Sequence, residues 1–320
     1  MELRQLRYFV RIVELNSFSK AAKDLFIAQP ALSNQISNLE KELNTQLLSR
    51  SVRGVAPTEA GKTLYAHAQA IIRQIEHLKH EVVNQSINPR GVVSIGIPTS
   101  VSNVLASSLI TAARSTYPEI QLKIVESLSG HLEELVSTGR IEMSLLFDNP
   151  YKISKQNEKN INYNLIRIPI LEEELYLQTT QILTIKSQQK KISMAKAAKL
   201  NFVLPGESNS TRQLIDHAFK KAGLELKVIT ELDSLSTIQS VVEDGLGATI
   251  LSLSAFVGSL NSRKSTAYSI QDANLKRTVS LCTSNTVTLS TAAQCIASLV
   301  PKIANQLVLS KKWAGSKMII

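Results

Sequence analysis

The sequence has few cysteines and no long apolar run, and both absences exclude classes of protein. Its only cysteines, Cys282 and Cys295, are too far apart for a CxxC motif and lack a histidine-rich neighbourhood, so neither a zinc site nor dithiol chemistry is expected. We expect two buried, reduced thiols. No stretch approaches the roughly 18 consecutive apolar residues of a membrane span, and charges interrupt the start "MELRQLRYFVRIVELNSF", where a signal peptide needs an apolar core. We therefore expect a cytoplasmic protein with no membrane partner.

The composition fits a globular chain of more than one domain. Hydrophobic residues make up 43% and charged residues 19%, without the charge excess of a disordered protein. A length of 320 residues is enough for two or three folded units. The net charge of +10 suits a polyanionic partner, but the first 90 residues hold twelve basic and eight acidic residues, and the remaining 230 hold 24 and 18. Charge alone therefore does not predict DNA binding.

Apolar spacing predicts three helices in the first 44 residues. The first covers residues 3–15, with an inward face at Leu6, Phe9, Val10 and Val13. Ser19 is a candidate cap for a short second helix, and Pro30 suits the first turn of a third, where its missing N–H is not needed. The buried stripe of the third helix is predicted at Leu32, Ile36, Leu39 and Leu43. This is the helix-turn-helix layout, whose second helix enters the DNA major groove.

The outer face of the third helix carries side chains that can contact base edges. Gln and Asn bond bidentately to adenine, and Ser can meet a base or a phosphate. A merely solvated face is the alternative, but it would more often use Glu and Lys, because Asn and Ser are mediocre helix formers. Two arginines of the following predicted hairpin, or wing, would reach phosphates or a minor groove. The predicted DNA-binding residues are Gln29, Pro30, Ala31, Ser33, Asn34, Ser37, Asn38, Arg50 and Arg53.

The first 61 residues resemble the amino-terminal domain of LysR-type transcriptional regulators. The landmarks "SFSKAA", "QPALS", "LEKELN" and "TEAG" occur in the order typical of that family. The segments "IAQPALS" and "RGVAPTEAGK" are similar to its nitrogen assimilation control branch. Asn44 and Ser49 stand where many members carry Gly and Phe, a difference expected to affect the packing of the wing and not the DNA-reading face. The resemblance implies a transcriptional regulator whose partner is double-stranded DNA.

A heptad pattern follows Thr58, a candidate N-cap. From Gly61, apolar residues recur in alternating steps of three and four at Leu64, Ala68, Ile71, Ile75, Leu78 and Val82. So narrow a seam favours contact with a partner helix, and hence a dimer; the alternative is a long helix lying on its own domain. A dimer presents two recognition helices to half-sites about one turn of DNA apart, or a multiple. The resemblance favours a tetramer built from such dimers.

After Gly91 the pattern changes to strands alternating with helices, which predicts βαβ units and a parallel sheet, and a similar plan restarts near residue 162. The resemblance implies a periplasmic-binding-protein-like sensor whose chain crosses between two lobes near residues 162–170 and 264–276. We therefore expect an α/β multidomain protein, divided as follows: a winged helix-turn-helix domain at 1–58, a linker and dimerisation helix at 59–90, a two-lobe effector-sensing domain at 91–305 (lobe I 91–161 and 268–305, lobe II 162–267), and a tail at 306–320.

Each lobe contains a strand that runs into proline, small hydroxyl residues and a helix: "IGIPTSVSN" and "VLPGESNST". Two helix amino termini facing a cleft suit a small anion or carboxylate, although each hydroxyl alone is explained equally well as an ordinary N-cap. Similarity to the family adds one serine and one phenylalanine. The predicted effector-binding residues are Thr99, Ser100, Ser102, Ser129, Phe147, Ser208, Ser210 and Thr211. In "GLGATILS", Ser252 replaces a proline found in many members.

Three functions compete. The favoured one is a sequence-specific DNA-binding transcriptional regulator modulated by a small anionic effector, with RNA polymerase left open as a further partner. The second keeps the DNA-binding domain and makes the sensor only an oligomerisation module. The third, an enzyme or small-molecule binding protein on the same lobes, has little support: "GESNS" half resembles G-x-S-x-G, "GLGATI" lacks the third glycine of a dinucleotide loop, and His217 lies within a predicted helix. We expect no enzymatic activity, catalytic residue, metal or cofactor.

Overall fold

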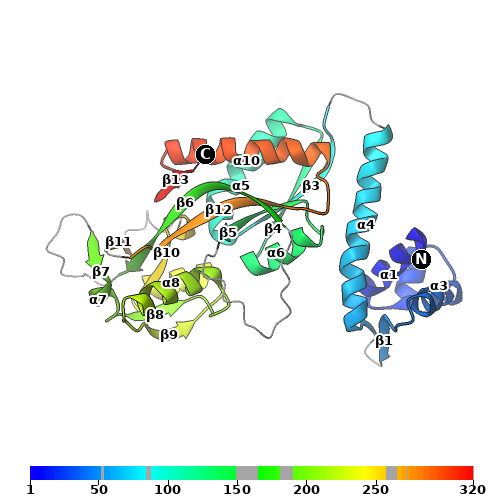
Figure 1. The fold of residues 1–320 in the computed structure, drawn as a ribbon, viewed down its shortest axis with the longest axis horizontal. Coiled ribbons are helices and arrows are strands. Elements are labelled where there is room, and N and C mark those ends of the chain that lie inside the picture. The colour runs from blue at the N-terminus through cyan, green and yellow to red at the C-terminus, as the bar shows by residue number, and fades with distance from the viewer. Residues whose placement is uncertain are drawn as a thin grey trace. The chain divides into compact units, whose positions relative to one another are not determined.

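The computed structural model describes residues 1–51, 54–83, 88–148, 165–180, 190–256, 265–271 and 273–319. The chain divides into two compact units. The amino-terminal unit comprises residues 1–87, together with the short segment 138–140, and the carboxy-terminal unit comprises residues 88–137 and 141–320. Each unit is described separately below, with the helices and strands labelled as in Figure 1.

The amino-terminal unit contains the three predicted helices, a two-stranded hairpin and a long helix (Figure 1). These elements are α1 (Leu3–Leu15), α2 (Phe18–Asp24), α3 (Gln29–Glu42), β1 (Leu48–Ser51), β2 (Gly54–Pro57) and α4 (Glu59–Val83). Its core is formed by Phe9, Ile12, Ala21, Leu32, Ile36 and Leu39, with Leu47 and Leu48 from the hairpin. Ile12 lies outside the predicted face of α1 but is fully buried. The helix-turn-helix and its wing are therefore confirmed.

Two local expectations in this unit are wrong. Ser17, and not Ser19, caps α2: the Ser17 hydroxyl accepts a hydrogen bond from the Lys20 N–H at 3.3 Å, whereas Ser19 lies inside the first turn. Leu43 was expected in the buried stripe of α3 but is 40% exposed. Because Leu43 is the C-cap of that helix, the next residue, Asn44, already turns the chain away in the left-handed region.

Gly61 sets how closely α4 approaches the hairpin. A Cβ atom at this position would lie 2.0 Å from the carbonyl oxygen of Leu47, so no other residue fits without a shift of the backbone. Thr58 caps α4 as predicted, because its Oγ1 accepts the Gly61 N–H at 3.0 Å and donates to the Gln46 carbonyl at 2.7 Å. The base of the wing is thus bonded directly to the start of α4.

The carboxy-terminal unit contains the predicted alternation of strands and helices. Its elements are β3 (Gly91–Ile97), α5 (Thr99–Thr116), β4 (Ile120–Glu126), α6 (Ser129–Ser137), β5 (Met143–Asp148), β6 (Leu165–Thr179), β7 (Lys191–Ser193), α7 (Met194–Ala197), β8 (Asn201–Leu204), α8 (Ser210–Lys221), β9 (Lys227–Glu231), α9 (Leu235–Glu243), β10 (Thr249–Ser252), the 3-10 helix η1 (Leu253–Phe256), β11 (Thr266–Gln271), β12 (Lys276–Ser284), α10 (Thr291–Leu309) and β13 (Ser316–Met318).

One sheet runs through both lobes of this unit. Its strand order is β4-β3-β5-β12-β6-β11-β7, and β10 and β13 also pair with β6. The pairing of β3 with β4 and β5 is parallel, as the βαβ pattern predicts, while β12 is antiparallel to both β5 and β6. In lobe I, α5 and α10 share one hydrophobic core with β3 (Figure 1). The apolar residues of α6 belong to a second, smaller core cluster.

The chain passes between the lobes on β6 and at the start of β12. Along β6, Leu171 belongs to the core of lobe I and Leu175 to that of lobe II. On the return, Leu275 still packs in lobe II and Val279 in lobe I. Lobe I therefore resumes after Leu275 and not at residue 268, because β11 pairs with the lobe II half of β6.

The residues assigned to a tail at 306–320 belong to lobe I where the structure describes them. The helix α10 continues to Leu309, Trp313 is buried in the lobe I core at 2% exposure, and β13 pairs with β6. By length and hydropathy alone, α10 would also qualify as a membrane span. Its buried residues all pack in the lobe I core, which accounts for its apolar composition.

The two cysteines differ in environment. Cys282 on β12 is fully buried, and burial raises the pKa of its thiol to about 12. Cys295 on α10 is only half-buried, which corrects the expectation that both thiols are inaccessible. Since the thiolate is the reactive form, only Cys295 is exposed enough to react in the folded protein.

We predict that Ellman's reagent titrates one thiol in the native protein and a second only after denaturation. The slow thiol is Cys282, because it is buried and its raised pKa leaves little thiolate at mildly alkaline pH. Replacing Cys295 by serine should remove the native reaction and leave the denatured one. Two thiols reacting rapidly in the native wild-type protein would contradict this assignment.

Candidate DNA-binding face and inter-lobe cluster

The outer face of α3 has the exposure that DNA contact requires. Leu32, Ile36 and Leu39 are buried beneath it. Of the predicted contacts on this helix, five are exposed and two half-buried: Gln29, Pro30, Ala31, Asn34 and Asn38 are exposed, and Ser33 and Ser37 are half-buried. Asn34 and Asn38 are one turn apart, so their amides project from the same side of the helix.

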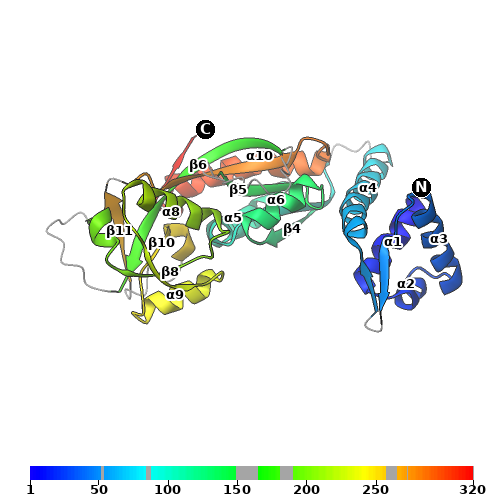
Figure 2. The ribbon, with the colours of Figure 1, turned by 60° about the horizontal axis from the view of Figure 1, so that its bottom comes forward.

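The turn before α3 positions the start of the helix. The Ser19 hydroxyl on α2 hydrogen-bonds Oε1 of Gln29 at 2.9 Å, and Figure 2 shows these two helices next to each other. Phe26, within the turn, adopts the left-handed region with φ 55° and is 94% exposed. An exposed aromatic ring therefore lies three residues before the first turn of α3.

The wing is bonded to the recognition helix through its backbone. Oε1 of Glu40 on α3 accepts the N–H groups of Leu47 at 2.7 Å and Leu48 at 3.1 Å. The hairpin strands pair antiparallel, with Arg50 opposite Val55. The Arg50 side chain and the whole of Arg53 lie outside the described residues. Their predicted contacts with DNA stay a prediction, while the strand that carries Arg50 is held in place by α3.

The seam predicted on α4 divides into two halves. Leu64 and Ala68 pack against α1 in their own unit. Further along the helix, Ile71 and Leu78 are exposed, the latter by 58%, and Ile75 is half-buried. The Val82 side chain lies outside the described residues. The interpretation of a helix lying on its own domain therefore holds for the first half of α4. Contact of the second half with a partner helix stays a prediction.

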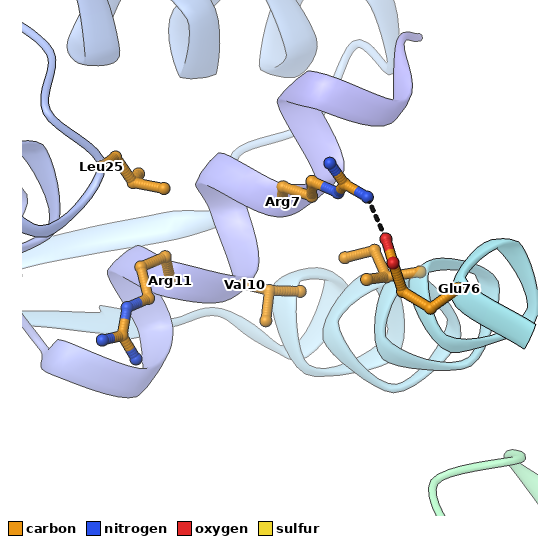
Figure 3. Close-up of a pocket in the computed structure, with 6 residues that line it drawn as sticks. Arg7, Val10, Arg11, Leu25 and Glu76 are labelled. Carbon is orange, nitrogen blue, oxygen red and sulfur yellow. Dashed lines mark hydrogen bonds and ion pairs between the residues drawn. The ribbon is translucent and has the colours of Figure 1, made fainter. Parts of the chain in front are cut away.

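A groove of about 500 Å³ lies between α1 and α4, with Leu25 at one end (Figure 3). Val10 and Ile72 give it an apolar lining, and its charged groups are paired within the unit. Arg7 forms an ion pair with Glu76 (Figure 3). Arg11 bonds both carboxylate oxygens of Asp24 at 2.6 Å, which lowers the pKa of that carboxyl. None of the predicted effector residues lines this groove.

The two lobes meet around a buried ion pair that was not predicted from the sequence. Arg277 on β12 lies opposite Glu173 on β6, and their side chains are 5% and 2% exposed. Nη2 and Nε of Arg277 donate to Oε2 of Glu173 at 2.7 and 2.9 Å. Burial lowers the pKa of Arg277 and the charge of Glu173 opposes that shift. A guanidinium stays protonated in proteins, so the pair is ionic.

Both lobes supply further contacts to the Arg277 guanidinium. From lobe I, Oγ of Ser100 accepts a bond from Nη2 at 3.0 Å, and the ring centroid of Phe147 lies 3.5 Å from Cζ, a cation–π contact. From lobe II, Oγ1 of Thr211 accepts from Nη1 at 2.7 Å and Oγ of Ser252 accepts from Nη2 at 2.9 Å. One side chain thus bonds elements of both lobes.

The second carboxylate oxygen of Glu173 is also satisfied. Its Oε1 accepts the Ser254 hydroxyl and the indole N–H of Trp313, each at 2.7 Å. A buried ion pair is tolerated when its remaining polar atoms are hydrogen-bonded, and removing one partner of such a pair typically costs about 3–5 kcal/mol. We call these residues the Arg277 cluster: Arg277, Glu173, Ser100, Phe147, Thr211, Ser252, Ser254 and Trp313.

Three of the eight predicted effector residues belong to this cluster: Ser100, Phe147 and Thr211. The other five make no hydrogen bond to Arg277 or Glu173 among the described residues: Thr99, Ser102, Ser129, Ser208 and Ser210. The N-cap of α8 is Asn209, whose side chain accepts the Thr211 N–H at 2.9 Å, and the N-cap of α5 is Pro98, which has no capping side chain. The hydroxyls of Ser100 and Thr211 therefore hold a cation in this structure, where the sequence predicts an anion.

Sequence reasoning missed the ion pair although a signal for it exists. In β6, Glu173 alternates with Leu171 and Leu175, so the period of two places this carboxylate on the buried face. In β12, Arg277 alternates in the same way with Val279. The alternation in each strand thus marks both charged residues as buried, but it does not identify either one as the partner of the other.

Two family models match the chain. Residues 3–62 match "Bacterial regulatory helix-turn-helix protein, lysR family", and residues 87–302 match "LysR substrate binding domain". Among curated proteins, the chain is similar to the nitrogen assimilation regulatory protein nac of Klebsiella aerogenes, at 36% identity over 80% of this chain and 79% of that protein. It is 33% identical to nac of Escherichia coli K12 over 98% of both chains.

Solved structures share the fold at low sequence identity. A full-length OxyR variant from Pseudomonas aeruginosa has a TM-score of 0.68 at 20% identity, covering 99% of this chain and 98% of that one. Full-length CbnR, solved in complex with its target DNA, has a TM-score of 0.64 at 19% identity, covering 95% of this chain and all of that one.

Proposed function

Because this chain belongs to the LysR family of DNA-binding transcriptional regulators, we propose that it reads its operator through the exposed face of α3. The observation that carries this proposal is the exposure of Asn34 and Asn38 on one side of a helix whose opposite side is fully packed. An asparagine amide can pair with N6 and N7 of adenine in the major groove. The carboxy-terminal domain is the effector-sensing part of the regulator.

Each part of the DNA-binding unit has a distinct role in this proposal. Side chains of α3 contact bases: Gln29, Pro30, Ala31, Ser33, Asn34, Ser37 and Asn38. Arg50 and Arg53 of the wing contact phosphates or a minor groove. The exposed ring of Phe26 adds an apolar contact beside the start of α3.

We predict that Asn34→Ala weakens binding to the operator by about 10-fold to 100-fold, because a lost bidentate base contact is worth about 1–3 kcal/mol. Binding to non-specific DNA should change little, since the amide makes no phosphate contact in this proposal. Fluorescence anisotropy with both DNAs at several salt concentrations measures the two affinities.

The matched control is Lys41→Ala on the same helix, which removes an exposed charge. This variant should weaken operator and non-specific binding alike and reduce the salt slope by about one. If Asn34→Ala lowered both affinities equally, α3 would not be the element that distinguishes bases.

Dimerisation through the outer half of α4 is the second part of the proposal. An apolar row on this half of the helix is not fully buried within one chain: Ile71, Ile75 and Leu78. Leu64 and Ala68, by contrast, pack against α1. The contact between two chains therefore centres on the outer row and on Val82, and two dimers form the tetramer. Paired chains place two recognition helices on two half-sites.

We predict that Leu78→Glu converts the protein to monomers in sedimentation velocity, because it places a charge in the proposed seam. The control is Thr63→Glu, which adds the same charge at an exposed position of α4 away from the seam. That variant should keep the wild-type oligomer. Dimers of Leu78→Glu that match wild type in stability would remove the seam from the proposal.

The sensor and its setting complete the proposal. The effector is a small anion or carboxylate held where the first turns of α5 and α8 meet, with Thr99, Ser102, Ser129, Ser208 and Ser210 around the Arg277 cluster.

The protein acts in the cytoplasm, where its DNA is. It regulates and does not catalyse: its relatives are named as regulators, and His217 is an exposed residue of α8 outside the Arg277 cluster.

A further inference from the structure

We propose that Arg277 and Glu173 form an internal latch, which joins lobe I to lobe II and occupies the place predicted for the effector. The latch is a property of the carboxy-terminal unit alone. Only its exchange with an anionic effector rests on the proposed function.

The contacts of Arg277 bridge the lobes evenly. Apart from Glu173, the guanidinium touches Ser100 and Phe147 of lobe I, and Thr211 and Ser252 of lobe II. These distances can be kept only while the two lobes stay at their present separation. Lysine could not replace this arginine, because its single ammonium lacks the planar fork that meets several acceptors and a ring face at once.

The latch lies on the strands by which the chain crosses between the lobes. Glu173 stands on β6 between a leucine of the lobe I core and one of the lobe II core, and Arg277 occupies the equivalent place on β12. Movement of one lobe relative to the other bends the chain at this level. The ion pair is therefore placed where it resists that movement.

The donors of Arg277 are almost all used. Of its five N–H groups, Nε bonds Glu173, the two of Nη2 are shared among Ser100, Glu173 and Ser252, and one of Nη1 bonds Thr211. A free carboxylate can thus bind Arg277 bidentately only by displacing groups already bonded to it, and among these only Glu173 is itself a carboxylate. An anionic effector acts at this junction by exchange with Glu173.

Ser252 connects the two sides of the latch. Its hydroxyl accepts from Arg277 at 2.9 Å and lies 2.7 Å from the hydroxyl of Ser254, which in turn donates to Glu173. A residue without a side-chain acceptor at this position would leave both bonds unmade. Ser252 is therefore part of the hydrogen-bond network that holds the pair.

The first experiment removes the guanidinium from the full-length protein with Arg277→Ala and then adds guanidinium ion. Trp313, the sole tryptophan, donates to Glu173, so its emission reports on the cluster, and hydrogen exchange in the first turns of α5 and α8 reports on the lobes. We expect red-shifted emission and exchange faster by about tenfold or more at both turns. Millimolar guanidinium should reverse both changes, and tetramethylammonium, which has the charge without the N–H groups, should not.

The control for the loss of a buried arginine is Arg212→Ala. Arg212 is 8% exposed and bonds Asp216, Glu231 and the Pro205 carbonyl, all within lobe II. This variant should speed exchange inside lobe II and leave the first turn of α5 at the wild-type rate. If Arg277→Ala behaved like Arg212→Ala, or kept wild-type exchange, the latch would be overturned.

A second pair of variants covers failure to fold and tests the exchange of carboxylates. The double variant Arg277→Met with Glu173→Gln removes both charges at similar volume, so it should fold. It should show fast hydrogen exchange at both turns and no response to guanidinium. Wild-type exchange rates in this variant would refute the latch.

Glu173→Ala leaves Arg277 without its anion, and acetate should restore the emission of Trp313 where chloride does not. Absence of that rescue would refute exchange by carboxylates. These measurements need no DNA, so failure of operator binding is distinguishable from failure of the latch.

Discussion

Burying the charge of Arg277 carries a large desolvation penalty, and the lobe junction is arranged to offset it. The offset comes from an ion pair, three hydroxyl acceptors and a ring face, which belong to elements distant in the chain. Well-packed apolar residues often stabilise such a position as well as an ion pair does, so the pair is not explained by stability alone. Its contribution is geometric. All of these groups meet only at one arrangement of the two lobes, and the central sheet, through β6 and β12, is held in that arrangement.

In the amino-terminal unit, α3 exposes one face while the rest of the helix is packed. Apolar residues bury the inner side of α3, and the carboxylate of Glu40 accepts two backbone N–H groups at the start of the wing, so the hairpin is bonded to the helix. The close approach at Gly61 and the cap at Thr58 join α4 to the hairpin. Because α4 uses its first half for this packing, the apolar row of its second half is left exposed.

Sequence periodicity predicted the helices of the amino-terminal unit and the alternation of strands and helices in the carboxy-terminal unit, since helical and strand spacings follow from which face each element buries. Local chemistry was predicted less well: Ser17 and Ser19 are both plausible caps, and the choice depends on where the preceding helix ends. The Arg277 cluster was out of reach for another reason. Glu173 and Arg277 are 104 positions apart, and alternation marks each as buried without indicating its partner. Trp313 was likewise left in a tail, because a single aromatic residue in a short polar segment has no periodicity to place it.

The sign of the charge at the lobe junction also could not be predicted from the sequence. Hydroxyls at the first turns of α5 and α8 suggested an anion, because helix amino termini favour negative charge. A hydroxyl both donates and accepts, however, so Ser100 and Thr211 are equally suited to accept from a guanidinium. The negative charge that the two helix ends favour is present nearby, but it belongs to Glu173, and Arg277 bonds both this carboxylate and the hydroxyls of Ser100 and Thr211. An anion from outside therefore has a resident competitor, and the chemistry of the effector follows from what can replace a carboxylate on a buried arginine.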